Sequence, residues 1–282
     1  SHSSPPQFNV QKFYISSRNE SMQIIQSFTT LYVDSYLNMH GNITKPYLNL
    51  GEIIMGNIQS EIIQTNINGV SAEGYLSKPA NLDSKAPGIV VIQEWWGLDD
   101  HIKSITERFA EQGFIAIAPD LFHGSVTTEP NEAMKLTQAM DQARAREEID
   151  ACVAYIQNSE DSSGKVGIVG YCLGGGLSIQ SACENSNISA CNIYYGGNPD
   201  LNSVQNLKAS VLGIYAENDE RITSTVPDLE KALNDNGIVN EIIIYPNVDH
   251  AFFNDTNLPV YNKEAAESAW NKTLTFFSDN LR

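Results

Sequence analysis

The segment Gly170-Tyr171-Cys172-Leu173-Gly174 follows directly on the apolar run 166–169 and constrains the fold of this chain more than any other feature. It has the form G-x-S-x-G with cysteine in the serine position, a pattern in which a strand ends, the chain turns sharply and a helix begins at once. Glycines flank the nucleophile because a Cβ would clash at that corner. A thiol at a helix N-terminus also faces the positive end of the helix dipole, which favours the reactive thiolate. An ordinary strand-to-helix turn around a small buried cysteine is the alternative.

A nucleophile on such a turn needs an acid and then a histidine, in that chain order, each in the loop after a later strand. The apolar run 210–215 predicts a buried strand that leads into a loop containing Asp219. The run 241–245 predicts another strand, and His250 follows it. In such a triad the imidazole accepts the thiol proton and the carboxylate fixes the tautomer and orientation of the imidazole. The order Cys172, Asp219, His250 therefore predicts a catalytic triad.

Other carboxylates compete with Asp219 for the role of orienting acid. Glu217 and Glu220 share its loop, whereas Asp249 adjoins His250 and would usually point elsewhere. A helix cap or a turn would equally account for a carboxylate at Asp219. The combined motif, order and spacing favour the catalytic interpretation over these alternatives.

Further motifs lie before and after the segment 170–174 along the chain. They are Gln93-Glu94-Trp95-Trp96-Gly97 after the strand 88–92, Ala118-Pro119-Asp120-Leu121-Phe122 after 114–117, the segment 170–174 extended to Gly175, Tyr194-Tyr195-Gly196, and Asp249-His250-Ala251-Phe252. Together they make residues 60–282 resemble the dienelactone hydrolase family, the cysteine branch of the α/β-hydrolases. The resemblance implies an α/β fold with a mostly parallel twisted sheet and helices on both faces. It also implies that a Cys-His-Asp triad cleaves an ester or a lactone, with no metal and no organic cofactor.

The resemblance assigns further roles around the nucleophile. The motif glutamate of the family matches Glu94, and it contacts the nucleophilic cysteine and helps to control its ionisation. By the same match, the backbone N–H groups of Trp95 and Leu173 form the oxyanion hole, which agrees with the general rule for such folds. Members that act on a carboxylate-bearing lactone carry an arginine four residues after the catalytic histidine, where this chain has Asn254. They carry another soon after the Pro-Asp-Leu motif, where this chain has Phe122-His123-Gly124.

The missing arginines predict a preference for uncharged esters or lactones, unless Arg221 or Lys78 reaches the pocket in their place. Side chains that follow the predicted strand ends are the expected substrate contacts, although packing beneath the loops would also account for the aromatic ones. These side chains are Trp96, Phe122, Tyr171, Phe252, Phe253 and Asn254.

Composition narrows the classes of partner. The formal net charge of −17 over 282 residues argues against nucleic acid, whose phosphates would be repelled. The longest apolar runs are far shorter than the ~18 residues that a membrane helix needs. We therefore expect a small-molecule ester or lactone as partner and a monomer or small homo-oligomer as assembly. A non-hydrolytic ligand-binding or redox-sensing protein on the same fold is the competing interpretation.

The sequence predicts an N-terminal extension over 1–58 with one helix at about 20–38, followed by a catalytic domain over 59–282. The family resemblance implies a cytoplasmic protein, and a first residue other than methionine leaves export open. Cys152 belongs to an apolar helical stripe, and a disulfide between Cys183 and Cys191 is disfavoured by the rarity of such bridges inside cells. Within the catalytic domain we expect a hairpin over 60–77 and helices at about 100–112, 131–141, 144–158, 175–184, 226–236 and 263–279.

Overall fold

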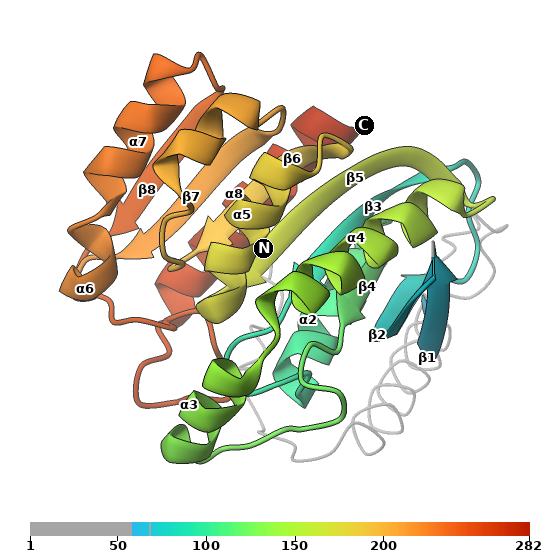
Figure 1. Cartoon of the computed structure of the whole chain (residues 1–282), viewed down its shortest axis with the longest axis horizontal. Helices are drawn as coiled ribbons and strands as arrows, with labels where there is room; N and C mark the ends of the chain where they lie inside the picture. The colour runs from blue at the N-terminus through green and yellow to red at the C-terminus, as the bar shows by residue number, and fades with distance from the viewer. Residues whose placement is uncertain (1–57, 68) are drawn as a thin grey trace, which may run out of the picture. The chain divides into compact units, whose positions relative to one another are not determined.

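This computed structural model describes residues 58–67 and 69–282. The strands in this part of the chain form one eight-stranded mixed sheet. The predicted extension over 1–58 and its helix lie outside the described residues, apart from residue 58. The strands follow the order β1-β2-β4-β3-β5-β6-β7-β8 across the sheet (Figure 1). Their bounds are β1 Ile58–Ile67, β2 Val70–Pro79, β3 Ala86–Ile92, β4 Ile115–Pro119, β5 Ser162–Tyr171, β6 Ile188–Tyr194, β7 Ser210–Ala216 and β8 Asn240–Tyr245.

The direction of the strands confirms the predicted architecture. β1 and β2 form the expected antiparallel hairpin, and β2 pairs antiparallel with β4. All other neighbouring strands are parallel. The strands also end in register, because Ile92 pairs with Gly170, Tyr171 with Tyr194, and Ala216 with Tyr245. The loops that follow β3, β5, β7 and β8 therefore leave the sheet at one edge, which is where an open parallel sheet usually holds its ligand.

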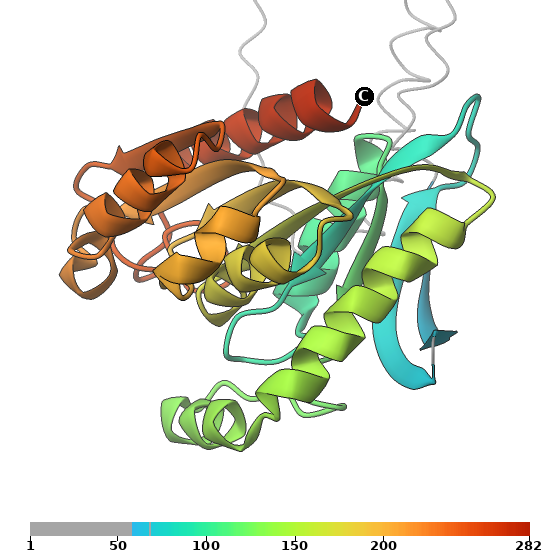
Figure 2. The same ribbon diagram turned by 45° about the horizontal axis from the view of Figure 1, so that its top comes forward.

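Helices cover both faces of this sheet (Figures 1 and 2). They are α2 Asp100–Glu111, α3 Pro130–Ala139, α4 Gln142–Asn158, α5 Leu173–Glu184, α6 Glu220–Thr223, α7 Val226–Asp235 and α8 Lys263–Leu281, with the 3-10 helix η1 Leu201–Asn206. Helices α4, α5 and α7 pack on one face, and α2 and α8 pack on the other. Figure 2 shows α8, in red, and α4, in yellow-green, on opposite sides of the strands. All six predicted helices of the catalytic domain are confirmed, whereas η1 and α6 are too short to produce an apolar period in the sequence.

The two faces have separate apolar cores. Strand β3 shows how one strand serves both, because Ile89 and Val91 belong to the core under α2 and α8, while Val90 and Ile92 belong to the core under α4 and α5. This alternation follows from the two-residue period of a strand. Each fully buried aliphatic side chain of this kind contributes about 1.5–3 kcal/mol relative to an exposed one. A rigid sheet therefore supports the loops at its edge.

The four cysteines are unpaired, so Cys183 and Cys191 form no disulfide in this structure. Cys152 lies fully buried in the core beneath α4, as its helical stripe predicts. Among the described residues, no helix combines the length and apolar character needed to cross a membrane.

Candidate active site

Cys172 occupies the corner between β5 and α5. Its backbone has φ 54° and ψ −112°, a conformation that residues other than glycine rarely adopt and that costs about 1–3 kcal/mol. Two backbone hydrogen bonds hold the corner: Cys172 N donates to Tyr194 O (3.0 Å), and Gly175 N donates to Cys172 O (3.0 Å). The predicted strand–turn–helix unit around Cys172 is therefore confirmed, with the strain that such a corner requires.

The glycines on either side of Cys172 are required by space. A Cβ on Gly170 would lie 1.8 Å from the carbonyl oxygen of Gly174, and a Cβ on Gly174 would lie 2.5 Å from the carbonyl oxygens of Ile92 and Gln93. Real Cβ atoms do not approach backbone this closely, so any other residue would force the turn or β3 to move. The structure therefore confirms that a Cβ at either glycine would clash with the backbone.

His250 and Asp219 meet between the loops after β8 and β7. The Nδ1 atom of His250 forms a short hydrogen bond with Oδ2 of Asp219. Because a carboxylate only accepts, Nδ1 carries the hydrogen and Nε2 is the nitrogen left for another partner. Asp219 is 8% exposed, and the His250 side chain is 29% exposed. The pair therefore combines a shielded carboxylate with an accessible ring.

The competing carboxylates have other partners. Glu217 accepts a hydrogen bond from the backbone N–H of Asn247 (2.8 Å), and Asp249 accepts one from the side-chain amide of Asn218 (2.9 Å). Glu220 is exposed in the first turn of α6. Of the four acids considered from the sequence, Asp219 is the one that contacts His250.

Glu94 is a buried carboxylate that follows β3 and contacts the loop after β8. It is 1% exposed, and it accepts hydrogen bonds from the hydroxyl of Tyr195 (3.3 Å) and the amide of Asn254 (2.8 Å). Burial raises the pKa of Glu94, and the charge of His101 is the largest influence in the opposite direction. The pKa of Tyr195 is raised well above its ordinary value by burial, so this hydroxyl keeps its proton and remains a donor.

The thiol of Cys172 corrects one expectation. Its pKa is raised to about 12, first by burial and then by the charge of Glu94, with Asp219 adding to the effect. The backbone N–H of Leu173, which hydrogen-bonds the sulfur, and the charge of Arg221 oppose this shift. The start of α5 therefore favours the thiolate as expected, but burial and the neighbouring carboxylates outweigh it. At neutral pH the substrate-free protein holds a protonated thiol.

Most of the predicted substrate contacts pack in the core instead. The rings of Tyr171 and Phe253 stack with centroids 5.4 Å apart, and the ring centroid of Phe252 lies 5.9 Å from that of Tyr195. Tyr171, Phe252 and Phe253 are each at most 2% exposed. Asn254 is also buried, with its amide bound to Glu94. These four side chains turn inward because ring contacts and a buried carboxylate hold them.

Trp96 remains as a candidate for a substrate contact. Trp96 is partly exposed and lies 4.9 Å from the ring of Trp95, also partly exposed. Phe122 is buried at 6% exposure, and the cavity of about 330 Å³ that it lines between α3 and α4 includes none of Cys172, Asp219 and His250. Lys78 and Arg221, the two basic side chains considered as substitutes for the missing arginines, differ in their surroundings. Lys78 pairs with Asp161 (2.6 Å), which precedes β5 and so lies at the end of that strand opposite Cys172, whereas the charge of Arg221 acts on the Cys172 thiol.

The sequence does not point to two residues that are connected with the environment of Glu94, His101 and Asp255. His101 in the first turn of α2 hydrogen-bonds Asp255 and acts electrostatically on Glu94. Nothing in the local pattern around either residue singles them out, because their partners are distant in the chain. Tyr195 belonged to a noted motif, but its contact with Glu94 is visible only in the folded chain.

Known proteins are similar to this chain in sequence and in fold. The model of the dienelactone hydrolase family matches residues 72–281. Protein usf of Aquifex pyrophilus is 34% identical over 232 residues, which cover 78% of this chain and 99% of that protein. An Aquifex aeolicus protein provisionally named a carboxymethylenebutenolidase is 31% identical over 233 residues, covering 79% of this chain and 99% of that protein. The crystal structure of a Klebsiella pneumoniae protein, provisionally named a dienelactone hydrolase, has a TM-score of 0.72 and 27% identity, covering 78% of this chain and 98% of that one.

Proposed function

Because this chain belongs to the dienelactone hydrolase family of hydrolytic enzymes, we propose that it cleaves carboxylic esters or lactones with Cys172 as the nucleophile. The observation that carries the proposal is the hydrogen bond between His250 and Asp219, which joins two loops beside the strained cysteine corner. Three residues from three separate strand ends supply a nucleophile, a base and an orienting acid, as nucleophilic catalysis requires.

In the first half of the proposed reaction, Nε2 of His250 takes the proton from the thiol of Cys172. The sulfur forms a bond to the carbonyl carbon, and the electron pair of the C=O bond moves to the oxygen. When that pair returns, the C–O bond to the alcohol breaks and His250 gives its proton to the leaving oxygen. The product is a thioester on Cys172, and in the case of a lactone the freed hydroxyl stays attached to the acyl group.

The second half regenerates the thiol. A water molecule attacks the thioester carbonyl while His250 accepts its proton, and the C–S bond then breaks. The carboxylic acid leaves and Cys172 recovers a proton from His250. Asp219 stabilises the imidazolium that forms in each half and keeps the ring in the required tautomer.

The backbone N–H groups of Leu173 and Trp95 are the proposed oxyanion donors. Leu173 N–H lies at the first residue of α5 and hydrogen-bonds the Cys172 sulfur before the reaction. The same N–H is therefore adjacent to the carbonyl oxygen once the sulfur has attacked. Removing one donor of this type typically costs about 10²–10³-fold in kcat.

The proposed role of Glu94 is to keep the resting thiol protonated. Its negative charge raises the pKa of Cys172, as does burial of the thiol. A protonated thiol is a poor target for oxidants, which react with thiolates. This argues against the redox-sensing alternative, because a sensor cysteine needs a lowered pKa.

Detection of the acyl-enzyme tests the proposal. The protein is mixed with p-nitrophenyl acetate, quenched in acid within the first turnovers, digested and examined by mass spectrometry. We expect one acetyl group on the peptide that contains Cys172, together with release of p-nitrophenol. Turnover with no acyl group on that peptide, and undiminished turnover by Cys172→Ala, would rule out the proposed nucleophile.

A further inference from the structure

The loop after β4 is hydrogen-bonded at two points to the segment that follows β3 and contains Trp95. The backbone N–H of Leu121 donates to Oε1 of Gln93 (3.2 Å), whose side chain is fully buried. The backbone N–H of Thr127 donates to the carbonyl oxygen of Trp96 (3.0 Å). Along the chain, the peptide that bears the Trp95 N–H therefore lies between two points of attachment to the same loop.

Gly97 shows how closely these two stretches of backbone approach each other. Its φ is 96°, and a Cβ at this position would lie 2.3 Å from the carbonyl oxygen of Ser125. Glycine is required here because it adopts this φ without strain and brings no Cβ toward the loop. A displacement of the loop at Ser125 or Thr127 would therefore be transmitted to the segment that contains Trp95.

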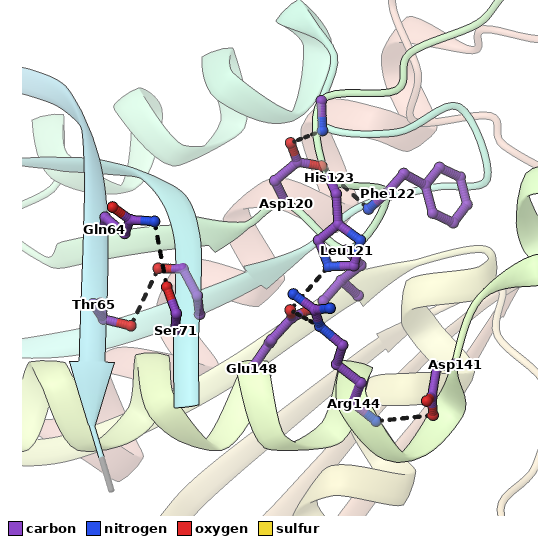
Figure 3. A network of polar contacts seen from close by, with 12 residues as sticks. Gln64, Thr65, Ser71, Asp120, Leu121, Phe122, His123, Asp141, Arg144 and Glu148 are labelled. Carbon is purple, nitrogen blue, oxygen red and sulfur yellow. Dashed lines mark hydrogen bonds and ion pairs between the residues drawn. The ribbon is translucent and has the colours of Figure 1, made fainter. Parts of the chain in front are cut away.

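The carboxylate of Asp120 holds the turn at the start of this loop. Its Oδ1 accepts the backbone N–H of Phe122 (3.2 Å) and its Oδ2 accepts that of Gly124 (2.6 Å), and Figure 3 shows Asp120 turned toward this stretch of backbone. His123 and Gly124 have φ values of 50° and 88°, in the left-handed region that is costly for a residue other than glycine. Asp120 is only 6% exposed, so its two hydrogen bonds stabilise a turn that the backbone would not otherwise favour.

The same turn is anchored to the sheet and to a helix. The backbone N–H of Asp120 donates to the carbonyl oxygen of Glu73 in β2 (2.8 Å). The side chain of His123 contacts Glu148 of α4, with Nε2 2.9 Å from Oε1, as Figure 3 shows. The loop after β4 is therefore fixed independently of the segment that it holds, and it serves as the support of that segment.

We propose that Asp120 is a positioning residue for the reaction, because the loop that it shapes holds the Trp95 N–H in place for the oxyanion. The role rests on the proposed function, in which Trp95 N–H is one of two oxyanion donors. Asp120 acts through the hydrogen bond between Thr127 and Trp96 and contributes no group to the substrate. An oxyanion donor works only at hydrogen-bond distance from the developing charge, and a misplacement of about 1 Å costs about 10²-fold in rate.

Asp120→Asn tests this role with little change in side-chain volume. The amide has one oxygen, so it accepts from only one of the Phe122 and Gly124 N–H groups, and the other N–H meets an NH₂ donor. We expect kcat for p-nitrophenyl acetate to fall on the order of 10²-fold with KM nearly unchanged, which is the pattern of an interaction made only in the transition state. An unchanged kcat would overturn the proposal.

Asp141→Asn is the matched control. Asp141 also accepts two backbone N–H groups, those of Ala143 (3.0 Å) and Arg144 (3.1 Å), at the start of α4, and Figure 3 shows this end of the helix. None of its hydrogen bonds in the described part of the chain reaches the segment that contains Trp95. Its kcat should stay unchanged, and equal losses in the two variants would refute a specific role of Asp120.

Alkylation of Cys172 separates loss of the oxyanion donor from general damage to the site. Iodoacetamide reacts at the sulfur with release of iodide and forms no oxyanion. The side chain of Glu94 is held from other loops by Tyr195 and Asn254, so its charge should stay beside the thiol. The alkylation rate of Asp120→Asn should therefore equal that of the unmodified protein. A rate that falls as far as kcat would show a general disturbance and would contradict the proposal.

A pair of variants at Thr127 tests the attachment itself without altering Asp120. Both Thr127→Pro and Thr127→Ala remove the hydroxyl, which accepts from Glu129 N–H (3.0 Å), but only proline also removes the backbone N–H that holds Trp96. We expect kcat to fall on the order of 10²-fold in the proline variant and to stay unchanged in the alanine variant. Equal kcat in the two would overturn the proposal, whether or not Asp120→Asn folds.

Amide hydrogen exchange measures the hold on this segment without substrate. A peptide that contains residues 93–98 should exchange on the order of tenfold faster in Asp120→Asn and Thr127→Pro than in their controls, because lost hydrogen bonds make local opening easier. Unchanged exchange would refute the link between the loop and the segment. An unmodified protein without esterase activity would instead refute the proposed function and leave the exchange result readable.

Discussion

The amide of Asn254 donates a hydrogen bond of 2.8 Å to the buried carboxylate of Glu94, across 160 positions of the chain. The resemblance to the family predicts a substrate contact at Asn254, where other members carry an arginine. The side chain instead completes the environment of a carboxylate whose charge raises the pKa of Cys172. A neutral amide holds this carboxylate without adding charge, which leaves compensation to other groups.

Loss of the Asn254 amide should destabilise the protein. In Asn254→Ala, Oε2 of Glu94 loses its donor at a buried position. An unsatisfied buried group costs about 1–3 kcal/mol, or more when it is charged. The free energy of unfolding, measured by urea titration, is expected to fall by at least that amount. Asn187→Ala, which removes an exposed asparagine from the loop between α5 and β6, serves as the control. Equal stability of the two variants would show that the contact contributes nothing.

Alkylating agents should label Cys172 selectively but slowly. Cys152, Cys183 and Cys191 are at most 3% exposed, whereas Cys172 is partly exposed, so iodoacetamide is expected to label Cys172 first. Because the pKa of Cys172 is raised to about 12, its thiolate fraction and labelling rate should rise continuously from pH 7 to pH 10. Mass spectrometry of peptides labelled at each pH measures this. A rate that levels off near neutral pH would show that the thiol is already ionised there.

Replacement of the nucleophile should nearly abolish turnover. Cys172→Ala is expected to lose on the order of 10⁴-fold or more in kcat for an aryl ester, the usual cost of removing a nucleophile. Cys172→Ser should retain part of the activity, since the same geometry serves either nucleophile. Full activity of the alanine variant would exclude the mechanism.

The two aspartates near His250 provide a matched pair. Asp219→Asn should reduce kcat on the order of 10⁴-fold, because an amide at this position favours the wrong imidazole tautomer. Asp249→Asn should have little effect, since Asp249 is bound to Asn218 at the surface. Steady-state kinetics with one aryl ester compares them, and the reverse order of damage would identify Asp249 as the orienting acid.

Substrate preference should follow charge. We expect a higher kcat/KM for p-nitrophenyl acetate than for a carboxylated dienelactone, because a carboxylate that enters a partly apolar site without a cationic partner is desolvated uncompensated. Arg221 is the basic side chain whose charge acts on Cys172, so any residual activity on the charged lactone should disappear in Arg221→Gln. A clear preference of the unmodified protein for the charged lactone would refute the substrate assignment without affecting the triad.

Glu94 should also contribute a pH dependence of stability. Its pKa is raised in the folded protein from an ordinary value of 4.5, so the folded state binds this proton more tightly than the unfolded state. Stability due to this group is therefore present at low pH and is lost as the pH rises from about 4.5 through the folded pKa. Urea titrations at a series of pH values measure how the free energy of unfolding changes with pH. Glu94→Gln should remove the part of this pH dependence that is due to Glu94, whereas Glu220→Gln, at an exposed position, should leave it unchanged.

The sequence predicts the parts of this molecule that depend on local pattern. The corner at Cys172 and the helices carry their signals within one short segment, and the chain order places Asp219 and His250 after their strands. It does not predict the direction of the Cys172 pKa, which depends on burial and on Glu94 from another strand end. The inward packing of Phe252 and Phe253 is also outside its reach, because their neighbours come from distant segments.

The position of β8 in the sheet has a consequence for how activity is lost on heating or in denaturant. Among the described strands β8 has one neighbour, β7, and it lies at the edge of the sheet, whereas β5 lies in the middle. Edge elements with few neighbours separate at a lower free energy than central strands do. His250 follows β8, so detachment of this edge would remove the base while the corner at Cys172 stays folded. Catalysis should therefore fail before the sheet unfolds, and an inactivated molecule would still recover its activity when the edge strand pairs again.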